Sequence, residues 1–145
     1  MLYSPTCQYA LRALIYLASQ KNADPVLGRK IAEDEGIPKQ FLSKILHLLR
    51  NKGLIVTTKG PGGGYRLARP PQRISLGQVV EAIDGKMDIS QRCILGLDKC
   101  SDEESCALHD QWKKFQKQYL STIKGLNLEQ AATTLNRKRK AAKAR

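Results

Sequence analysis

The sequence feature that most constrains the fold is a glycine-rich stretch, Gly60-Pro61-Gly62-Gly63-Gly64, near the middle of the chain. It cannot lie inside a helix or a strand, because glycine is entropically costly there and proline lacks a backbone N–H. Short segments rich in β-branched and aromatic residues flank it at positions 54–58 and 65–68 and are typical of strands. The stretch is therefore predicted to be the tip of a β-hairpin.

Two helices are predicted just before this hairpin. The first spans residues 29–35 and ends at Gly36, a residue that suits the position after a helix. The second opens at Pro38 and ends at Gly53, and its apolar residues recur at the spacing of a buried helix face. These apolar residues are Phe41, Leu42, Ile45, Leu48 and Leu49. Because the turn at 36–38 is tight, the two helices are predicted to form a helix-turn-helix with the hairpin as its wing.

The opposite face of the second helix is polar and basic, with side chains that reach phosphates and base edges. A solvated helix face would have the same composition, so this face alone leaves both interpretations open. The glycine-rich wing favours DNA, because glycine lets the backbone approach a sugar-phosphate strand closely. The predicted DNA-binding residues are Arg29, Lys39, Gln40, Ser43, Lys44, His47, Lys59, Gly60, Pro61, Gly62, Gly63, Gly64, Tyr65 and Arg66.

The charge of the chain supports a polyanionic partner. Over 145 residues it carries a formal +12 at pH 7, which favours nucleic acid first and a membrane surface second. The final segment, 137–145, holds six basic residues and no acidic one, and we expect it to be disordered. The rest of the chain is also basic, so the folded part shares the preference.

Membrane, secreted and enzymatic classes are disfavoured. No apolar run approaches the ~20 residues that span a bilayer, and the N-terminus lacks the layout of a secretory signal. We therefore expect a cytoplasmic protein without membrane association, whose thiols stay reduced. We find no nucleophile–histidine–acid arrangement, and the glycine-rich stretch lacks the Lys-Ser/Thr of a phosphate-binding loop, so no enzymatic activity is expected.

The expected fold class is mostly α with a small β-hairpin. Besides the helix-turn-helix, helices are predicted at residues 5–19, 75–83 and 128–135, and a long helix begins near Cys106. The segment from 86 to 105 lacks periodicity and is expected to be an ordered loop. The predicted organisation is a winged helix-turn-helix domain at 1–84, a loop with three cysteines at 85–107, a long helix with a short closing helix at 108–136, and the basic tail at 137–145.

The long C-terminal helix is apolar along one side, where its apolar residues step by four and three, close to coiled-coil spacing. Packing against the first helix of the same chain would cover this side. Of the two arrangements we expect pairing with the same helix of a second copy, which makes the protein a homodimer. The predicted dimer contacts are Leu108, Trp112, Phe115, Tyr119 and Ile123.

Three cysteines, Cys93, Cys100 and Cys106, follow the winged unit in the pattern C-x6-C-x5-C, and His109 comes three residues later. The loop around them is polar, which disfavours a merely buried role for the thiols. If the long helix begins at Cys106, then Cys106 and His109 share a face of its first turn, and its positive end favours a thiolate. Thiolates and an imidazole suit structural zinc or an iron–sulfur cluster, and bare thiols would also serve as a redox switch. The fourth cysteine, Cys7, is expected to be a core residue.

Several motifs resemble those of the Rrf2 family of bacterial transcription regulators. The similarity covers nearly the whole chain except the basic tail, and it combines the wing motif with the cysteine triad downstream. The matching segments are Tyr9-Ala10-Leu11-Arg12-Ala13-Leu14, Ile37-Pro38-x-x-Phe41-Leu42, Leu49-Arg50-x-x-Gly53-Leu54-Ile55, Lys59-Gly60-Pro61-Gly62-Gly63-Gly64-Tyr65 and Ile74-Ser75-Leu76.

The resemblance implies a homodimer on a palindromic operator in double-stranded DNA. The helix that opens at Pro38, the third helix of each chain, would lie in the major groove, with half-sites about one helical turn apart. It further implies that the three cysteines hold an iron–sulfur cluster. The segment Cys106-Ala107-Leu108-His109 is similar to that of relatives in which a histidine is the fourth ligand, so a 2Fe-2S cluster is favoured over 4Fe-4S. The expected function is a sequence-specific transcriptional regulator that senses iron–sulfur status, redox state or nitric oxide. The alternative is a zinc-stabilised or thiol-redox-switched winged-helix regulator without a cluster.

Overall fold

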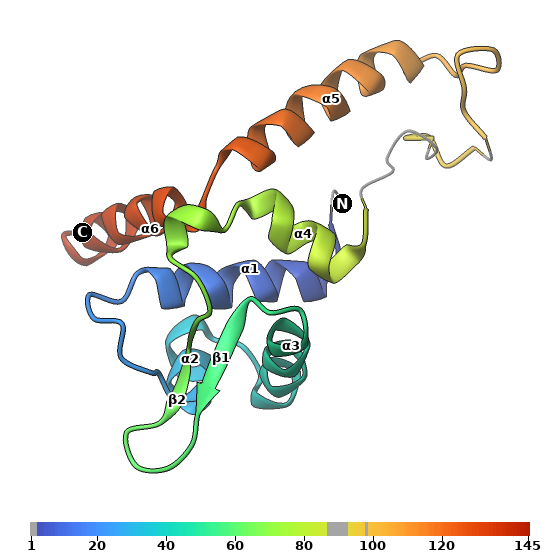
Figure 1. The fold of residues 1–145 in the computed structure, drawn as a ribbon. Helices are drawn as coiled ribbons and strands as arrows, with labels where there is room; N and C mark the ends of the chain where they lie inside the picture. The colour runs from blue at the N-terminus through green and yellow to red at the C-terminus, as the bar shows by residue number, and fades with distance from the viewer. Residues whose placement is uncertain (1–2, 87–92, 98) are drawn as a thin grey trace.

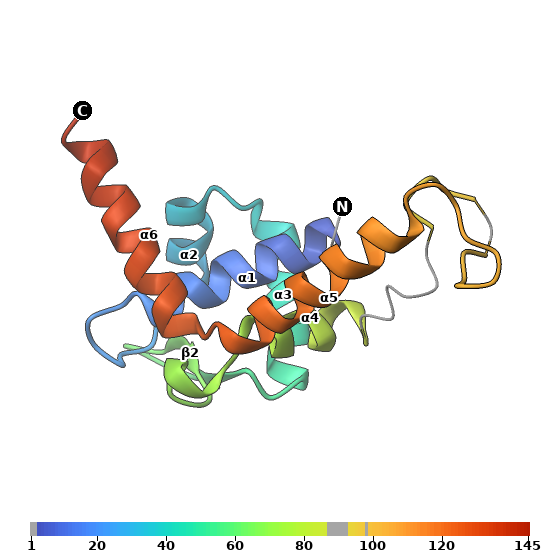
Figure 2. The same cartoon turned by 90° about the horizontal axis from the view of Figure 1, so that it is seen from above.

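The computed structural model describes residues 3–86, 93–97 and 99–145. Its elements in chain order are α1 (Pro5–Ala18), α2 (Gly28–Glu35), α3 (Lys39–Asn51), β1 (Ile55–Thr58), β2 (Gly64–Leu67), the 3-10 helix η1 (Pro71–Arg73), α4 (Leu76–Asp84), α5 (His109–Gly125) and α6 (Leu128–Lys143). Helix α1 runs through the middle, with α2, α3 and the hairpin on one side and α4 and α5 on the other (Figure 1). Seen from above, α6 crosses one end of α1 and projects away from the body (Figure 2). The expected fold class is confirmed.

The winged helix-turn-helix forms as the glycines predict. Gly36 ends α2 in the left-handed conformation with a φ of 62°, which glycine adopts without steric cost. Strands β1 and β2 pair antiparallel, with Thr58 opposite Gly64 next to the hairpin tip. Val26, which lies just before α2, forms two backbone hydrogen bonds with Tyr65 of β2, of 2.8 and 2.7 Å. These bonds fix the wing against the helix-turn-helix.

The core of this unit is centred on α1, where Ala10, Ala13 and Leu14 are fully buried. Burying a large aliphatic side chain contributes roughly 1.5–3 kcal/mol, so the packing around α1 is a major source of stability. The large side chains of the same cluster come from the other elements and include Ile31, Leu42, Leu49, Ile55, Val79 and Leu128. Helices α2, α3, α4 and α6 therefore share one core. Within the described residues, no helix has the length and apolarity needed to cross a membrane.

The buried face of α3 differs from the prediction at its first turn. Leu42, Ile45 and Leu49 are buried as predicted, together with Leu46, but the side chain of Phe41 is 56% exposed. A helix turns by about 100° per residue, so a stripe centred on these four positions leaves residue 41 at its edge. The prediction that Phe41 belongs to the core was wrong.

The C-terminal helices begin and end at different residues from those predicted. Helix α5 starts at His109, so Cys106 lies before the helix and not in its first turn. Helix α6 continues to Lys143, so the predictions of a short closing helix at 128–135 and of a disordered tail at 137–145 were both wrong. A capping box between Asn127 and Gln130 starts α6, while alanine, lysine and arginine favour its continuation. Basic side chains near its end also complement the helix dipole.

Helix α6 is further held by a network that the sequence did not suggest. The side chain of Glu35, the last residue of α2, is only 6% exposed and lies between two guanidinium groups. The Arg12 Nε atom of α1 is 3.5 Å from one of its carboxylate oxygens, and Arg139 of α6 donates to the other. Arg139 also lies over the ring of Tyr16, 5.9 Å from the centroid. These contacts connect the C-terminal helix to the helix-turn-helix.

Candidate metal centre and nucleic-acid interface

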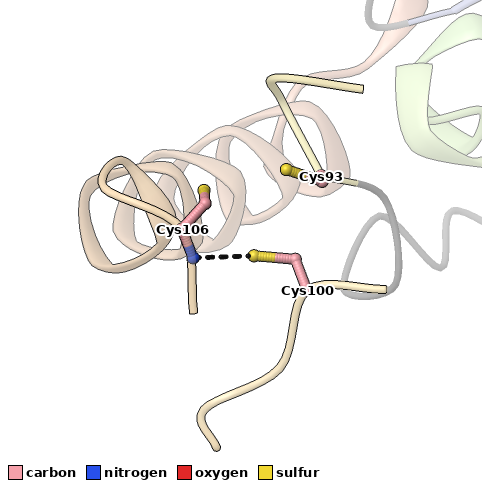
Figure 3. A group of neighbouring side chains, drawn as sticks. All are labelled: Cys93, Cys100 and Cys106. Atoms are coloured by element: carbon pink, nitrogen blue, oxygen red, sulfur yellow. Dashed lines mark hydrogen bonds between the residues drawn. The ribbon is translucent and has the colours of Figure 1, made fainter. Parts of the chain in front are cut away.

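The three clustered cysteines converge on one point in space. The Sγ atoms of Cys93, Cys100 and Cys106 all lie within 4.8 Å of one another and point into a common volume (Figure 3). Gly96, with a φ of 73°, allows the turn after Cys93, whose carbonyl accepts a 3.0 Å hydrogen bond from the Gly96 amide. The backbone N–H of Cys106 approaches the Cys100 sulfur at 3.5 Å. The loop therefore brings together thiols that are separated by six and five residues in the sequence.

The three thiols influence one another electrostatically. Desolvation opposes ionisation of Cys93, but hydrogen bonds from the backbone of Leu95 and Leu97 and from the thiols of Cys106 and Cys100 together lower the pKa of this thiol. At Cys100 the backbone N–H of Cys106 acts to lower the pKa, yet desolvation and the neighbouring thiol of Cys106 outweigh it, so the pKa is raised. One thiolate thus forms at the expense of another, because like charges at this separation repel. A cation placed among the three sulfurs would relieve that repulsion.

His109 lies next to the triad, but it does not belong to the group of side chains whose ligand atoms all lie within 4.8 Å of one another. Its side chain is almost buried, and its Nδ1 atom is 3.0 Å from the Cys100 sulfur. Its Nε2 atom is 2.9 Å from an oxygen of Asp102, which in turn accepts hydrogen bonds of 2.8 Å from Lys113. Lys113, and secondly His109, lower the pKa of Asp102. Sequence reasoning did not find the roles of Asp102 and Lys113, because no spacing rule connects a loop carboxylate to a ring on the next helix.

Soft thiolates with a nearby imidazole form a donor set that suits zinc or iron–sulfur centres. A histidine that ligates a metal usually has its other ring nitrogen hydrogen-bonded to a carboxylate, which is the relation between His109 and Asp102. The residues present therefore fit such a centre. Cys7 lies apart in α1 and is fully buried, and burial raises its pKa to about 12. Its prediction as a core residue is confirmed.

The predicted DNA-binding residues of α3 all lie on its exposed side. They are Lys39, Gln40, Ser43, Lys44 and His47, and the last of these lies 3.2 Å from the amide nitrogen of Asn51. Arg29, in the first turn of α2, is also exposed. Helix α3 and the hairpin lie at the same end of the molecule, remote from α5 (Figure 1). This end therefore presents a polar and basic surface formed by two helices and a wing.

The wing residues divide into two groups. The exposed group, available to a partner, consists of Lys59, Gly60, Pro61 and Gly62 at the tip and of Arg66 in β2. Gly63 and Gly64 instead form the hairpin itself, because a Cβ atom on Gly63 would lie 2.2 Å from the carbonyl oxygen of Thr58, and one on Gly64 would lie 2.4 Å from that of Val26. The ring of Tyr65 is half-buried and packs over Gly28 at the start of α2. The structure gives these three residues a role within the fold.

The predicted dimer contacts also occupy two environments. Ile123 is buried against Cys7 and Val80 of its own chain, and Tyr119 packs on the same cluster. Toward the start of α5, Leu108 is 44% and Phe115 is 48% exposed. The rings of Trp112, Phe115 and Tyr119 stack along the helix, with centroids 5.6 and 6.3 Å apart. The uncovered apolar surface of α5 therefore lies in its N-terminal half.

Comparison with known proteins places this architecture among transcription regulators. The family model described as "Rrf2: Iron-dependent Transcriptional regulator" matches residues 3–134. The regulator IscR of Aliivibrio salmonicida is 32% identical over 83% of this chain and 71% of its own length, and that of Escherichia coli O1:K1 is 31% identical over 83% and 74%. Among solved structures, CymR, the global cysteine regulator of B. subtilis, aligns over 92% of this chain and 98% of its own, with a TM-score of 0.77 and 22% identity. IscR of T. potens aligns over 93% and 88%, with a TM-score of 0.72 and 24% identity.

Proposed function

This chain belongs to the Rrf2 family of transcription regulators, and from that premise we propose that it binds operator DNA and senses iron–sulfur status, redox state or nitric oxide through a cluster held by Cys93, Cys100 and Cys106. The observation that supports the proposed sensing function is the mutual approach of the three sulfurs to within 4.8 Å. When bound, an iron–sulfur centre supplies cationic iron that compensates the thiolate charges and an electronic state that responds to oxidants. We propose that the protein works in the cytoplasm, where its thiols stay reduced.

We assign the fourth ligand to His109, which favours a 2Fe-2S cluster. Asp102 and Lys113 support this choice, because the carboxylate accepts from Nε2 and leaves the Nδ1 lone pair directed at the sulfur of Cys100. Nδ1 is therefore the atom through which His109 would hold such a cluster, together with the three thiolates. The order of the loop from Cys93 to Cys106 would then depend on the cluster.

DNA recognition is assigned to the exposed residues of α3 and of the wing tip. Basic side chains on both elements suit phosphate contacts, and Gln40 and Ser43 suit hydrogen bonds to base edges. A second copy is proposed to cover Leu108 and the exposed apolar side chains in the N-terminal half of α5, including Phe115. Two heads held about 34 Å apart would match the half-sites of a palindromic operator. A shift at the start of α5 would change that spacing and so alter operator affinity.

The test is anaerobic purification followed by iron and acid-labile sulfide assays, visible spectroscopy and operator binding. Cys93→Ala, Cys100→Ala and Cys106→Ala should each abolish the brown colour and stoichiometric iron, and should change operator affinity. Cys7→Ala is the matched control, because this thiol is buried away from the triad and should leave iron content unchanged. Triad variants with normal iron content and normal operator binding would contradict the proposal that the protein senses through a cluster held by the three cysteines.

The alternative function is a zinc-stabilised or thiol-redox-switched regulator of the same fold. Three free thiols within 4.8 Å of one another also favour zinc ligation, or formation of a disulfide between two of them when an oxidant removes two electrons and two protons, after a small movement of the loop. A colourless, zinc-replete preparation would support the zinc form. A reversible change in operator affinity on oxidation of a metal-free preparation, lost in Cys100→Ala, would support the thiol switch.

A further inference from the structure

Phe41 is a large apolar side chain that stays mostly exposed to solvent. It is the third residue of α3 and 56% exposed, although the helix already contributes Leu42, Ile45, Leu46 and Leu49 to the core. A phenyl ring left in water forgoes the favourable transfer free energy that burial would give. Its exposure on this helix therefore points to an external contact.

The surroundings of Phe41 indicate what kind of partner it meets. It lies in the first turn of the recognition helix, the part whose side chains reach base edges in helix-turn-helix complexes. Its neighbour one residue back is Gln40, and its neighbour three residues ahead, on the same side of the helix, is Lys44, both exposed. Such a polar and cationic setting suits a polyanion better than the apolar surface of a protein.

We propose that Phe41 is a specificity-determining residue that contacts the C5-methyl group of a thymine in each operator half-site. A phenyl ring cannot accept or donate the hydrogen bonds that phosphates and most base edges require. The thymine methyl group is the apolar feature that the major groove presents, and phenylalanine is among the residues that contact it. The proposal rests on the proposed binding of operator DNA and adds one base preference to it.

The experiment replaces thymines by deoxyuridine, which lacks only this methyl group, one symmetric pair at a time in a duplex operator obtained by binding-site selection. At one of these symmetric pairs, deoxyuridine should lower the affinity of the wild-type protein by about fourfold per half-site. This is the factor expected when one methyl group is removed from an apolar contact. Phe41→Ala should bind the thymine operator more weakly and should lose this dependence on the methyl group. Lys44→Ala is the matched control and should weaken both operators by the same factor, because a lysine contact to phosphate does not sense the methyl group.

Several results would overturn the assignment. One is that no deoxyuridine position affects the wild-type protein, and another is that Phe41→Ala keeps the full methyl dependence. In both cases the wild-type protein still binds its operator. A selection that enriches no duplex would instead overturn the proposed function. Circular dichroism establishes that Phe41→Ala is folded, and Phe41→Leu, which keeps an apolar side chain, should retain part of the methyl dependence.

Discussion

The ion pairs around Glu35 predict a non-additive loss of stability when their arginines are removed. The Glu35 side chain is 6% exposed, whereas those of Arg12 and Arg139 are 45% and 39% exposed. Replacing either arginine by methionine leaves the carboxylate one cationic partner and keeps much of the aliphatic packing. Because the guanidinium groups are partly solvated, each single substitution should lower the free energy of unfolding by only about 1 kcal/mol.

The double substitution Arg12→Met/Arg139→Met leaves the nearly buried carboxylate of Glu35 without a cation. Breaking a buried ion pair in this one-sided way costs about 3–5 kcal/mol, so the loss should exceed the sum of the two single effects by ~1–3 kcal/mol. Adding Glu35→Gln to the double variant removes the unpaired charge and should restore much of this excess. The sign of the coupling follows from burial of the acid and not from the number of ion pairs.

Urea unfolding followed by circular dichroism measures these free energies, with the m-value checked for constancy across the variants. Lys138→Met is the matched control, because Lys138 is the exposed neighbour of Arg139 on α6 and should have little effect. A chain truncated after residue 136 should be destabilised by about as much as Arg139→Met. Strictly additive losses, or equal effects of Arg139→Met and Lys138→Met, would refute the reasoning and mean that α6 is not energetically tied to α2.

Three further predictions concern the wing, the cysteine site and α5. Gly63→Ala should weaken operator binding by about tenfold, because its Cβ would lie 2.2 Å from a backbone oxygen across the turn, whereas Pro61→Ala at the exposed tip should bind within about twofold of wild type in a mobility-shift titration. Asp102→Asn should shorten the lifetime of the iron–sulfur spectrum in air by about tenfold, since it weakens the hold on His109, and an unchanged lifetime would argue against His109 as a ligand. Phe115→Glu should shift the protein toward monomer in analytical ultracentrifugation, and an unaltered sedimentation coefficient would exclude the exposed half of α5 as the dimer contact.

The winged unit could be predicted because its determinants are local. Gly36 fixes the end of α2, and the glycines at 60–64 allow only a turn, so these residues specify the conformation that the structure adopts. The N-caps at Ser4 and Ser75 likewise mark the starts of α1 and α4 through hydrogen bonds within three residues. Each of these signals acts over one turn of chain and needs no tertiary context.

The features that escaped prediction depend on contacts between distant residues. The tail was expected to be disordered because of its charge, but Arg139 donates a hydrogen bond to the buried carboxylate of Glu35, 104 positions earlier in the chain. Phe41 fits the apolar spacing of α3, and only the packing of the other helices decides that its edge of the stripe stays uncovered. For the same reason the spacing of the cysteines identified a candidate ligand set, while the carboxylate hydrogen-bonded to His109 could be found only in the fold.

The two ends of α5 are suited to different tasks, and this asymmetry gives the proposed sensing a physical route. At its C-terminal end α5 packs so closely on α4 that a Cβ on Gly77 would lie 3.0 Å from the Lys124 side chain, and backbone hydrogen bonds of 2.8 and 2.9 Å join residues 74–76 to 126–128. This end cannot move without the winged unit. The N-terminal end, beside the cysteines, extends away from the body with its apolar side chains exposed (Figure 1). In the proposed homodimer, a change in the order of the cysteine loop would therefore act at the N-terminal end of α5, while its other end is fixed to the winged unit. A small local change there would alter the spacing of the two proposed DNA-binding units.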